Sequence, residues 1–317
     1  MKSARFRFVL TVLGFTVLAI ASTGVAFAQS QCSSSITACG CTIGAPGNYT
    51  VAEPLIFSQG LTLKNGCIDI AGQDINLYAA DYTIIGPGSD PACETENQRK
   101  NAYTGIHVLP GASNVSMYFT SSESYVCGWN YGLEVEGNNI NIYYSGTYYD
   151  NIGILFNNAS SNDCIYCYAD YNVTGIKIVG GSGNQLNNSA AFKNSQYGFW
   201  IAGSKENIIS YDGAYDYDYG LYDNKLAGIY LGCSPTGNVK PSIPCSTPTT
   251  GNSILANDVY ENYKYGIALE KGSIDNQIQE NGAYYNAVED FIDGNGNCIY
   301  NQYLYNGYYK KTPSCID

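Results

Sequence analysis

Residues 153–179 read GILFNNASSNDCIYCYADYNVTGIKIV, and this stretch begins and ends with the same phrase. The phrase is a glycine followed by alternating apolar residues, GILFN at Gly153 and GIKIV at Gly175, 22 residues apart. Further copies occur in the 317-residue chain at Gly105, Gly132, Gly198, Gly228 and Gly266. Recurrence at a spacing near 22 residues indicates a repeat architecture. The longer spacings of 27, 30 and 38 residues are read as the same repeat with loop insertions.

Two series of polar residues follow the same repeat. One lies three or four residues before the next glycine, at Asp150, Asn172, Asn194 and Asn262, with Asp216 before the insertion that precedes Gly228 and Asn286 in the equivalent place. The other lies after the glycine phrase, at Asn139, Asn184, Asn207, Asn252, Asn276 and Asn297. Like residues recur at like positions when each coil of chain stacks in parallel on the last, about 4.8 Å away. We therefore predict an all-β fold, a single-stranded right-handed parallel β-helix of about ten coils with disulfide-tied caps and loops.

Several stretches carry a family resemblance. They are GCIDIAGQDINLYAADYTIIGPGS at 66–89, GIHVLPGASNVSM at 105–117 and the five-residue spacing of Asn276, Asn281 and Asn286. Together they resemble the right-handed parallel β-helix repeat superfamily, which includes pectate-lyase-like folds and the periplasmic NosD family. The likeness extends over roughly residues 47–316. It implies the fold but no single activity, because the superfamily includes lyases, hydrolases, epimerases, adhesins and proteins without known catalysis.

The chain is expected to have three parts. Residues 1–28 have the basic start, apolar run and small-residue end of a cleaved signal peptide. Residues 29–46 are expected to form an N-terminal cap, and 47–317 the β-helix, with insertions near 87–103, 216–227 and 233–251. We therefore predict a secreted, periplasmic or cell-surface protein without a transmembrane anchor.

Cysteine content and charge limit the function further. All twelve cysteines follow the predicted signal peptide, so disulfides are expected, with Cys233–Cys245 and Cys298–Cys315 as candidate pairs. The formal net charge is −12. A protein this acidic repels phosphate backbones, so nucleic acid is excluded as a partner, and an anionic polymer is disfavoured unless a cation bridges the two.

An outward-facing column of side chains is the first candidate site. In the glycine phrase the apolar residues point inward and the residue between them points outward. Stacking then aligns His107, Glu134, Leu155, Lys177, Trp200, Tyr230 and Ala268, with Glu136 in the neighbouring column. His107, Glu134, Glu136 and Lys177 are the candidate catalytic residues. Trp200 and Tyr230, expected to be exposed and suited to stacking on sugar faces, are the candidate substrate-binding residues. The alternative interpretation is a solvated ladder whose Glu134–Lys177 charge pair contributes little.

A second candidate site is acidic. Carboxylates crowd the sequence YDGAYDYDYGLYDNK, and several carboxylates on one loop can bind Ca²⁺. The pattern matches no EF-hand loop, and a solvated turn has the same composition. Calcium is thus the one cofactor that the residues suggest, with the candidate ligands Asp212, Asp216, Asp218 and Asp223.

Two functions remain open. The first is a secreted protein that binds extracellular polysaccharide through the outward column and, if it is an enzyme, cleaves it as a polysaccharide lyase or glycoside hydrolase. The second is a non-catalytic cell-surface or matrix scaffold or adhesin. Few residues typical of the enzymes of this superfamily are present. Arg99 is the only arginine after the predicted signal peptide, and the adjacent Asp pairs and Gly-His-Gly turn of related hydrolases are absent. Copper, which the NosD likeness suggests, lacks ligands because only His107 and Met117 remain after cleavage.

Overall fold

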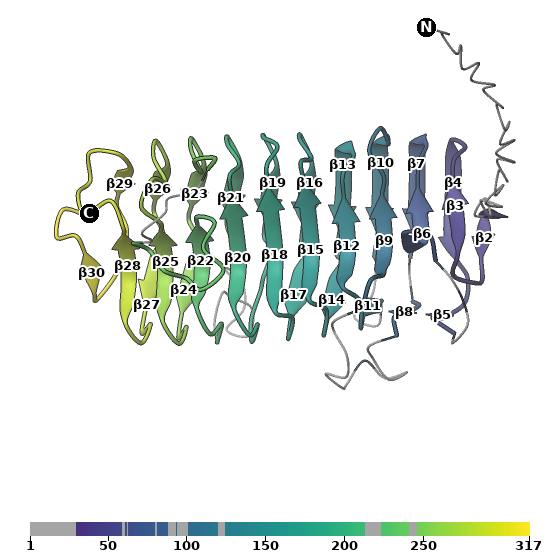
Figure 1. Cartoon of the computed structure of the whole chain (residues 1–317), viewed down its shortest axis with the longest axis horizontal. Coiled ribbons are helices and arrows are strands. Elements are labelled where there is room, and N and C mark those ends of the chain that lie inside the picture. The colour runs from purple at the N-terminus through teal and green to yellow at the C-terminus, as the bar shows by residue number, and fades with distance from the viewer. Residues whose placement is uncertain are drawn as a thin grey trace, which may run out of the picture.

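The computed structural model describes residues 30–58, 61, 63–79, 81–87, 93, 101–119, 124–212, 223–240 and 246–317. In these ranges the chain forms strands and turns without a helix, and the strands pair in parallel. The predicted signal peptide lies outside the described residues. Coils stack along one axis into an elongated body, with the chain visiting each face in turn (Figure 1). The prediction of an all-β parallel solenoid is confirmed.

Three faces build the body. Sheet 1 consists of β1 (Ser30–Gln31), β3 (Cys41–Ile43), β6 (Gly66–Ile70), β9 (Thr104–Val108), β12 (Tyr131–Val135), β15 (Ile152–Asn157), β18 (Thr174–Val179), β20 (Tyr197–Ala202), β22 (Ala227–Leu231), β25 (Tyr265–Leu269), β28 (Glu289–Asp293) and β30 (Lys311–Thr312). Sheet 2 consists of β2 (Ser35–Ile36), β4 (Gly47–Val51), β7 (Gln73–Tyr78), β10 (Ser113–Tyr118), β13 (Asn138–Tyr143), β16 (Asp163–Ile165), β19 (Gln185–Asn187), β21 (Ile208–Ser210), β23 (Ser253–Leu255), β26 (Gln277–Gln279) and β29 (Gln302–Leu304). The third face has two pieces: β5 (Leu55–Ile56), β8 (Ile84–Ile85), β11 (Tyr125–Cys127), β14 (Gly146–Tyr148) and β17 (Tyr168–Asp170), then β24 (Asp258–Tyr260) and β27 (Gly282–Tyr284).

The apolar residues of the glycine phrase form the core. Leu133 pairs with Ile106 on one side and Ile154 on the other, and Ile154 pairs with Ile176. All four side chains are buried. Because the register is unbroken, like residues lie over like, as the repeat predicted.

Buried asparagine ladders satisfy the backbone at the corners of the coils. Asn184, for example, donates from Nδ2 to the Ala159 carbonyl at 2.9 Å and to Asn207 Oδ1 at 3.0 Å. Its own Oδ1 accepts from Nδ2 of Asn162 at 2.9 Å. This amide thus bonds to the coil before it and to the coil after it, which keeps corner groups from being buried without partners. The complete ladder is Asn162, Asn184, Asn207, Asn252, Asn276 and Asn301.

Some ladder members differ from the predicted ones. Asn139 is exposed at a corner with φ 57°, so it is outside the ladder that begins at Asn162. In the predicted series that precedes the glycines, Asn224 lies between Asn194 and Asn262, where Asp216 was expected. Part of the extra loop therefore precedes the ladder position, and this shifts the register by eight residues relative to the prediction.

The recurring glycines lie directly against a second ladder of buried asparagines, which consists of Asn172, Asn194, Asn224, Asn262 and Asn286. A Cβ atom at Gly153 would come 2.7 Å from Nδ2 of Asn172, and one at Gly175 would come 2.8 Å from the Ala191 side chain. Real Cβ atoms do not approach so closely. The glycine phrase therefore recurs because each coil passes too close to the next corner for any side chain.

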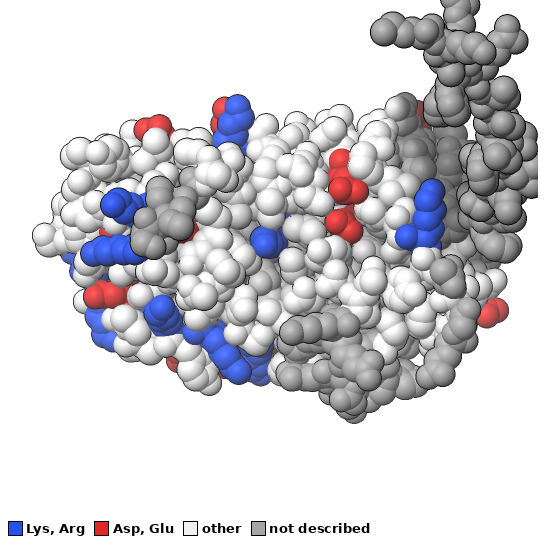
Figure 2. All heavy atoms as spheres, viewed as in Figure 1, with Lys and Arg blue, Asp and Glu red and all other residues white. Residues whose placement is uncertain are grey.

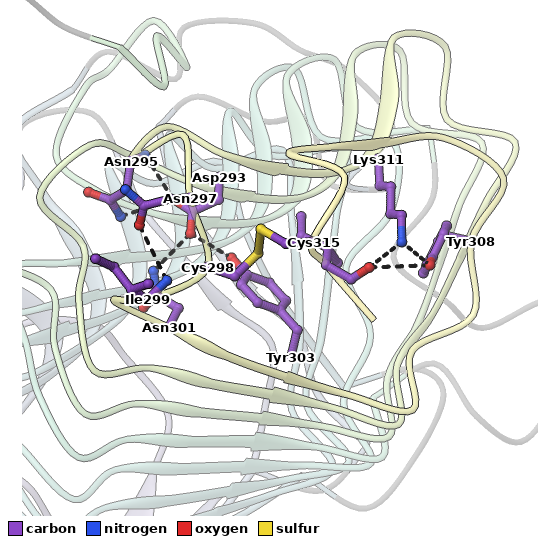
Figure 3. Close-up of a disulfide and its surroundings, with 11 residues drawn as sticks. Asp293, Asn295, Asn297, Cys298, Ile299, Asn301, Tyr303, Tyr308, Lys311 and Cys315 are labelled. Atoms are coloured by element: carbon purple, nitrogen blue, oxygen red, sulfur yellow. Dashed lines mark hydrogen bonds between the residues drawn. A yellow bond between two sulfur atoms is a disulfide. The ribbon is translucent and has the colours of Figure 1, made fainter.

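Disulfides tie the ends and two of the corners. Residues 30–43, within the segment expected to be a cap, contribute β1, β2 and β3 to the two long sheets. Cys298 pairs with Cys315, as the sequence suggested, beside Asp293 and Tyr303 (Figure 3). Cys233 is disulfide-bonded, and its expected partner Cys245 lies outside the described residues. The other described pairs are Cys32–Cys41, Cys39–Cys67, Cys93–Cys127 and Cys164–Cys167.

These bonds bear on the compartment. Disulfides persist in oxidising spaces, so the described pairs are consistent with an extracellular protein. Among the described residues, we find no helix with the length and apolar character needed to cross a membrane. Of the predicted insertions, the structure describes residues 87, 93 and 101–103 of the first, 223–227 of the second, and all but 241–245 of the third.

Candidate functional site

The predicted outward column exists on sheet 1. Strand pairing places Glu134 beside His107 and Leu155, and Lys177 between Leu155 and Trp200. Tyr230 and Ala268 continue the column beyond Trp200. The spacing of the glycine phrases therefore predicted the neighbours of each side chain correctly.

The exposure of the aromatic residues was predicted wrongly. Trp200 is only 8% exposed and Tyr230 is 0% exposed, so neither offers a face on which a sugar could stack. Trp200 Nε1 donates to the Gly232 carbonyl at 2.6 Å, and both rings pack in a small apolar cluster with Tyr197 and Val239. The segment that begins near Cys233 folds over these rings.

Glu270 holds this covering segment in place. Its Oε2 accepts from the backbone N–H groups of Cys233 at 2.6 Å and Ser234 at 2.8 Å, and from the Tyr230 hydroxyl at 3.0 Å. Ser234 in turn accepts from the Tyr197 hydroxyl at 2.8 Å through its carbonyl. A carboxylate that accepts several bonds at a buried position is a strong anchor.

The remaining polar part of the column forms a compact cluster of His107, Glu134 and Glu136. His107 Nε2 lies 2.9 Å from Glu136 Oε2 and 3.7 Å from Glu134 Oε2. Glu134 and Glu136 leave the same face of one chain segment because they are two residues apart. His107 comes from β9 and is in register with Glu134 on β12. The structure thus brings together three of the four predicted catalytic residues.

Two further residues orient the carboxylates. Asn157 Nδ2 donates to Glu134 Oε1 at 3.3 Å and to Glu136 Oε1 at 3.1 Å. The Thr104 hydroxyl donates to Glu134 Oε2 at 3.3 Å. Neither residue was among the candidate site residues, although the repeat places Asn157 in the same column as Glu136.

The cluster is largely withdrawn from solvent. The His107 and Glu134 side chains are 9% and 12% exposed, while the Glu136 side chain is 25% exposed. Burial raises the pKa of Glu134, His107 opposes that shift, and the Glu136 carboxylate adds to it. On the face shown in Figure 2, acidic side chains gather at one place over β12 and β13, with basic side chains on either side.

Asp69 extends the cluster by one strand and was also missed. It is paired with His107, is 1% exposed, and accepts from the Gly66 N–H at 2.8 Å. Burial raises the pKa of Asp69. Its signal was partial, because in GCIDI at 66–70 the aspartate lies between two apolar residues, as His107 does, but three residues after the glycine instead of two.

Lys177 lies apart from the carboxylates. Leu155 separates it from Glu134 in the column, so the charge pair considered in the sequence does not involve adjacent residues. Its Nζ lies 3.5 Å from the centroid of a Trp200 ring. Burial lowers the pKa of Lys177 to about 8.

Of the four candidate calcium ligands, the structure describes Asp212 and Asp223. Asp212 is fully buried in a corner ladder, where it accepts from the Ser189 N–H at 2.6 Å and donates from its own N–H to Asn257. Asp223 is half-buried at a different corner, directly before Asn224. Asp216 and Asp218 lie outside the described residues. Ser189 and Asn257 occupy the equivalent position in the neighbouring coils, so Asp212 belongs to the core rather than to a loop.

Comparisons with known proteins agree with the fold. No family model and no curated protein sequence matches the chain. The chain is similar to the solved structure of pectate lyase Pel9A, with a TM-score of 0.51 at 18% identity, covering 89% of this chain and 70% of that one. A tailspike protein domain of bacteriophage CBA120 matches with a TM-score of 0.40 at 13% identity, covering 89% and 41%. The A-module of the mannuronan C-5 epimerase AlgE6 of Azotobacter vinelandii matches with a TM-score of 0.30 at 13% identity, covering 86% and 62%.

The parallel sheets and the likeness to pectate lyase Pel9A define the class of protein by fold. The chain is a right-handed parallel β-helix protein with a pectate-lyase-like fold, as its repeats predicted. Identities this low describe architecture and leave the chemistry to the site.

Proposed function

We propose that this protein binds an extracellular polysaccharide along the outward face of sheet 1, between β9 and β18. One observation supports this most directly: Glu136, Asn157 and Lys177 reach solvent from neighbouring strands of this one face. Adjacent strands are about 4.8 Å apart, so a chain lying along the solenoid axis would meet a polar group at successive steps. The pectate lyase that shares the fold is consistent with a polysaccharide as the class of ligand to test.

The net charge of −12 favours a neutral polysaccharide. Residue types that polysaccharide-cleaving enzymes use also lie on this face, namely Glu134, Glu136 and Lys177. Glycoside hydrolysis, the route open to a neutral chain, uses a pair of carboxylates. β-Elimination uses a base such as lysine and applies only to a chain of uronates. We therefore propose binding as the function and cleavage as the activity to be assayed with it.

The test is glycan binding by the full-length mature chain, followed by assays for new reducing ends and unsaturated uronates, with and without a chelator. Asn157→Ala and Lys177→Ala should each weaken binding by about 10-fold, because each removes a hydrogen-bonding or charged contact worth over 1 kcal/mol. The control is Glu261→Gln, which changes an exposed corner residue away from sheet 1. Absence of binding to both neutral and acidic glycans would contradict the proposal.

A non-catalytic scaffold is the second candidate. The burial of Trp200 and Tyr230 favours it, because the aromatic platform expected for a sugar site is used for internal packing. Stacked tyrosines on the outside, such as Tyr144 and Tyr166 with ring centroids 5.0 Å apart, supply contact area for adhesion. Surface attachment that persists in Asn157→Ala and Lys177→Ala, without glycan binding, would support this function.

A further inference from the structure

The cluster of His107, Glu134 and Glu136 has the geometry of a metal site. One possible ligand atom from each residue lies within 4.8 Å of the other two. Tetrahedral ligands at about 2.1 Å from an ion are about 3.4 Å apart. The separations of 2.9 and 3.7 Å from His107 Nε2 to the two carboxylates lie on either side of that value. Small side-chain shifts would therefore place all three donors around one ion.

The donor types select the class of ion. An imidazole nitrogen with two carboxylate oxygens suits divalent transition metals such as Zn²⁺ and Mn²⁺. Calcium and magnesium prefer sites made of oxygen ligands alone. His107 is the only histidine in the chain, and it lies beside the two glutamates.

The surroundings hold the donors in position. Asn157 bonds one oxygen of each carboxylate, and Thr104 bonds the other oxygen of Glu134. Outer hydrogen bonds of this kind orient metal-binding carboxylates. Glu134 and Glu136 come from one chain segment and His107 from its paired strand, so the backbone of a rigid sheet sets their separation.

His107 gives an independent indication. The residue is 7% exposed, and its Nε2, the ring nitrogen that a metal ion would bind, is directed at the two carboxylates. Packing alone does not explain a polar ring here, because Leu155 occupies the equivalent position two strands away.

We propose that His107, Glu134 and Glu136 bind one divalent transition-metal ion, with Asn157 and Thr104 orienting the carboxylates. The positive ion would offset the repulsion between two closely spaced carboxylates and the adjacent Asp69. The glutamate side chains retain some exposure, which leaves a coordination position open to solvent. This site goes beyond the proposed glycan binding and does not depend on it.

The experiment is calorimetric titration of the full-length mature chain, tag-free and stripped with a chelator, with Zn²⁺, Mn²⁺ and Ca²⁺ in turn. One Zn²⁺ or Mn²⁺ per chain should bind, with Ca²⁺ binding more weakly. The chain suits this test, because it has a single histidine and none of its described cysteines is free to bind metal. Glu136→Gln and His107→Gln should each weaken binding about 10-fold or more, whereas Glu261→Gln should not.

Folding of each variant is checked by its thermal unfolding, and a second measurement uses the unmodified protein. The single imidazole gives one set of NMR resonances, which should shift in step with the calorimetric binding curve. Failure of Zn²⁺ and Mn²⁺ to bind at millimolar concentration would overturn the proposal, as would binding that leaves the imidazole resonances unmoved. The titration contains no glycan, so its failure is separate from a failure of polysaccharide binding.

Discussion

At the scale of single residues, the corners of the coils explain much of the composition. Tyr144, Tyr166 and Glu280 adopt left-handed φ values of 58°, 56° and 58° at equivalent corners. Non-glycine residues adopt this conformation only where surrounding structure holds them there. The residue that follows this corner is buried and polar in most coils. These residues bond from coil to coil and form a ladder that consists of Ser189, Asp212, Asn257 and Asn281.

Asp212→Asn tests whether the aspartate lowers the stability of the folded protein relative to an asparagine at the same place in the ladder. Its Oδ2 is buried without a partner, and burial raises its pKa well above the usual value. The folded state therefore retains a proton that the unfolded state loses above about pH 4, and stability falls as pH rises through that window. The variant lacks this penalty and donates two amide hydrogens, as Asn257 does in the next coil. We expect it to be about 1–3 kcal/mol more stable at pH 7, with little difference below pH 4.

Urea unfolding at a series of pH values measures this difference. Asp275→Asn is the matched control, because Asp275 is an exposed corner residue in the same body. A difference at Asp212 that does not change with pH would show that its carboxyl group is not neutral in the folded protein.

At the scale of elements, the segment after β22 determines which part of the sheet 1 face is open. Residues 232–239 run back over β20 and β22, and the Lys271 N–H bonds to the Val239 carbonyl at 2.8 Å. This segment closes the C-terminal part of the outward column, while the cluster on β9 and β12 retains access to solvent. The position of the candidate site therefore depends on where one insertion folds.

Glu270→Ala is predicted to release this segment. The variant removes the acceptor of three hydrogen bonds, two of them from backbone N–H groups, and should cost about 3 kcal/mol. Trp200 should then become accessible to acrylamide, measured by fluorescence quenching, while Trp129 stays buried as an internal reference. Glu270→Gln keeps one acceptor oxygen and should show a smaller change. Equal quenching in the original protein and both variants would mean that other contacts hold the segment.

At the scale of the whole molecule, each coil contacts only its neighbours, so the terminal coils are the least supported. At the C-terminal end Lys311 Nζ donates to the Tyr308 hydroxyl and the Ile316 carbonyl, and the Cys298–Cys315 disulfide joins the last residues to the preceding coil (Figure 3). These contacts cover the end of the apolar core, where Ile316 is buried.

Removing the terminal disulfide should therefore have a local effect. In the double variant Cys298→Ala, Cys315→Ala we expect faster amide exchange in β29 and β30, with protection in β12 and β15 unchanged. The disulfide closes a loop of 17 residues, so its loss should cost about 3 kcal/mol of local stability. Hydrogen exchange with mass spectrometry makes the comparison, and a uniform loss of protection along the body would contradict this view of the solenoid.

Sequence periodicity alone determined the fold, the core and the neighbours of each outward side chain. Ile106, Leu133 and Ile176 stack as their spacing predicted, because a solenoid repeats its local structure and period therefore translates directly into position. The grouping of His107 with Glu134 followed for the same reason.

Tertiary structure alone decided which of those side chains are accessible. Trp200 and Tyr230 are covered because Glu270 captures a segment 36 to 37 residues earlier in the chain, and no repeat encodes that contact. Asp212 lies in the core because its ladder continues through an insertion whose length breaks the period. The burial of an outward side chain depends on where the non-repeating segments fold. Long-range hydrogen bonds set the path of these segments, and the local sequence pattern does not predict such bonds.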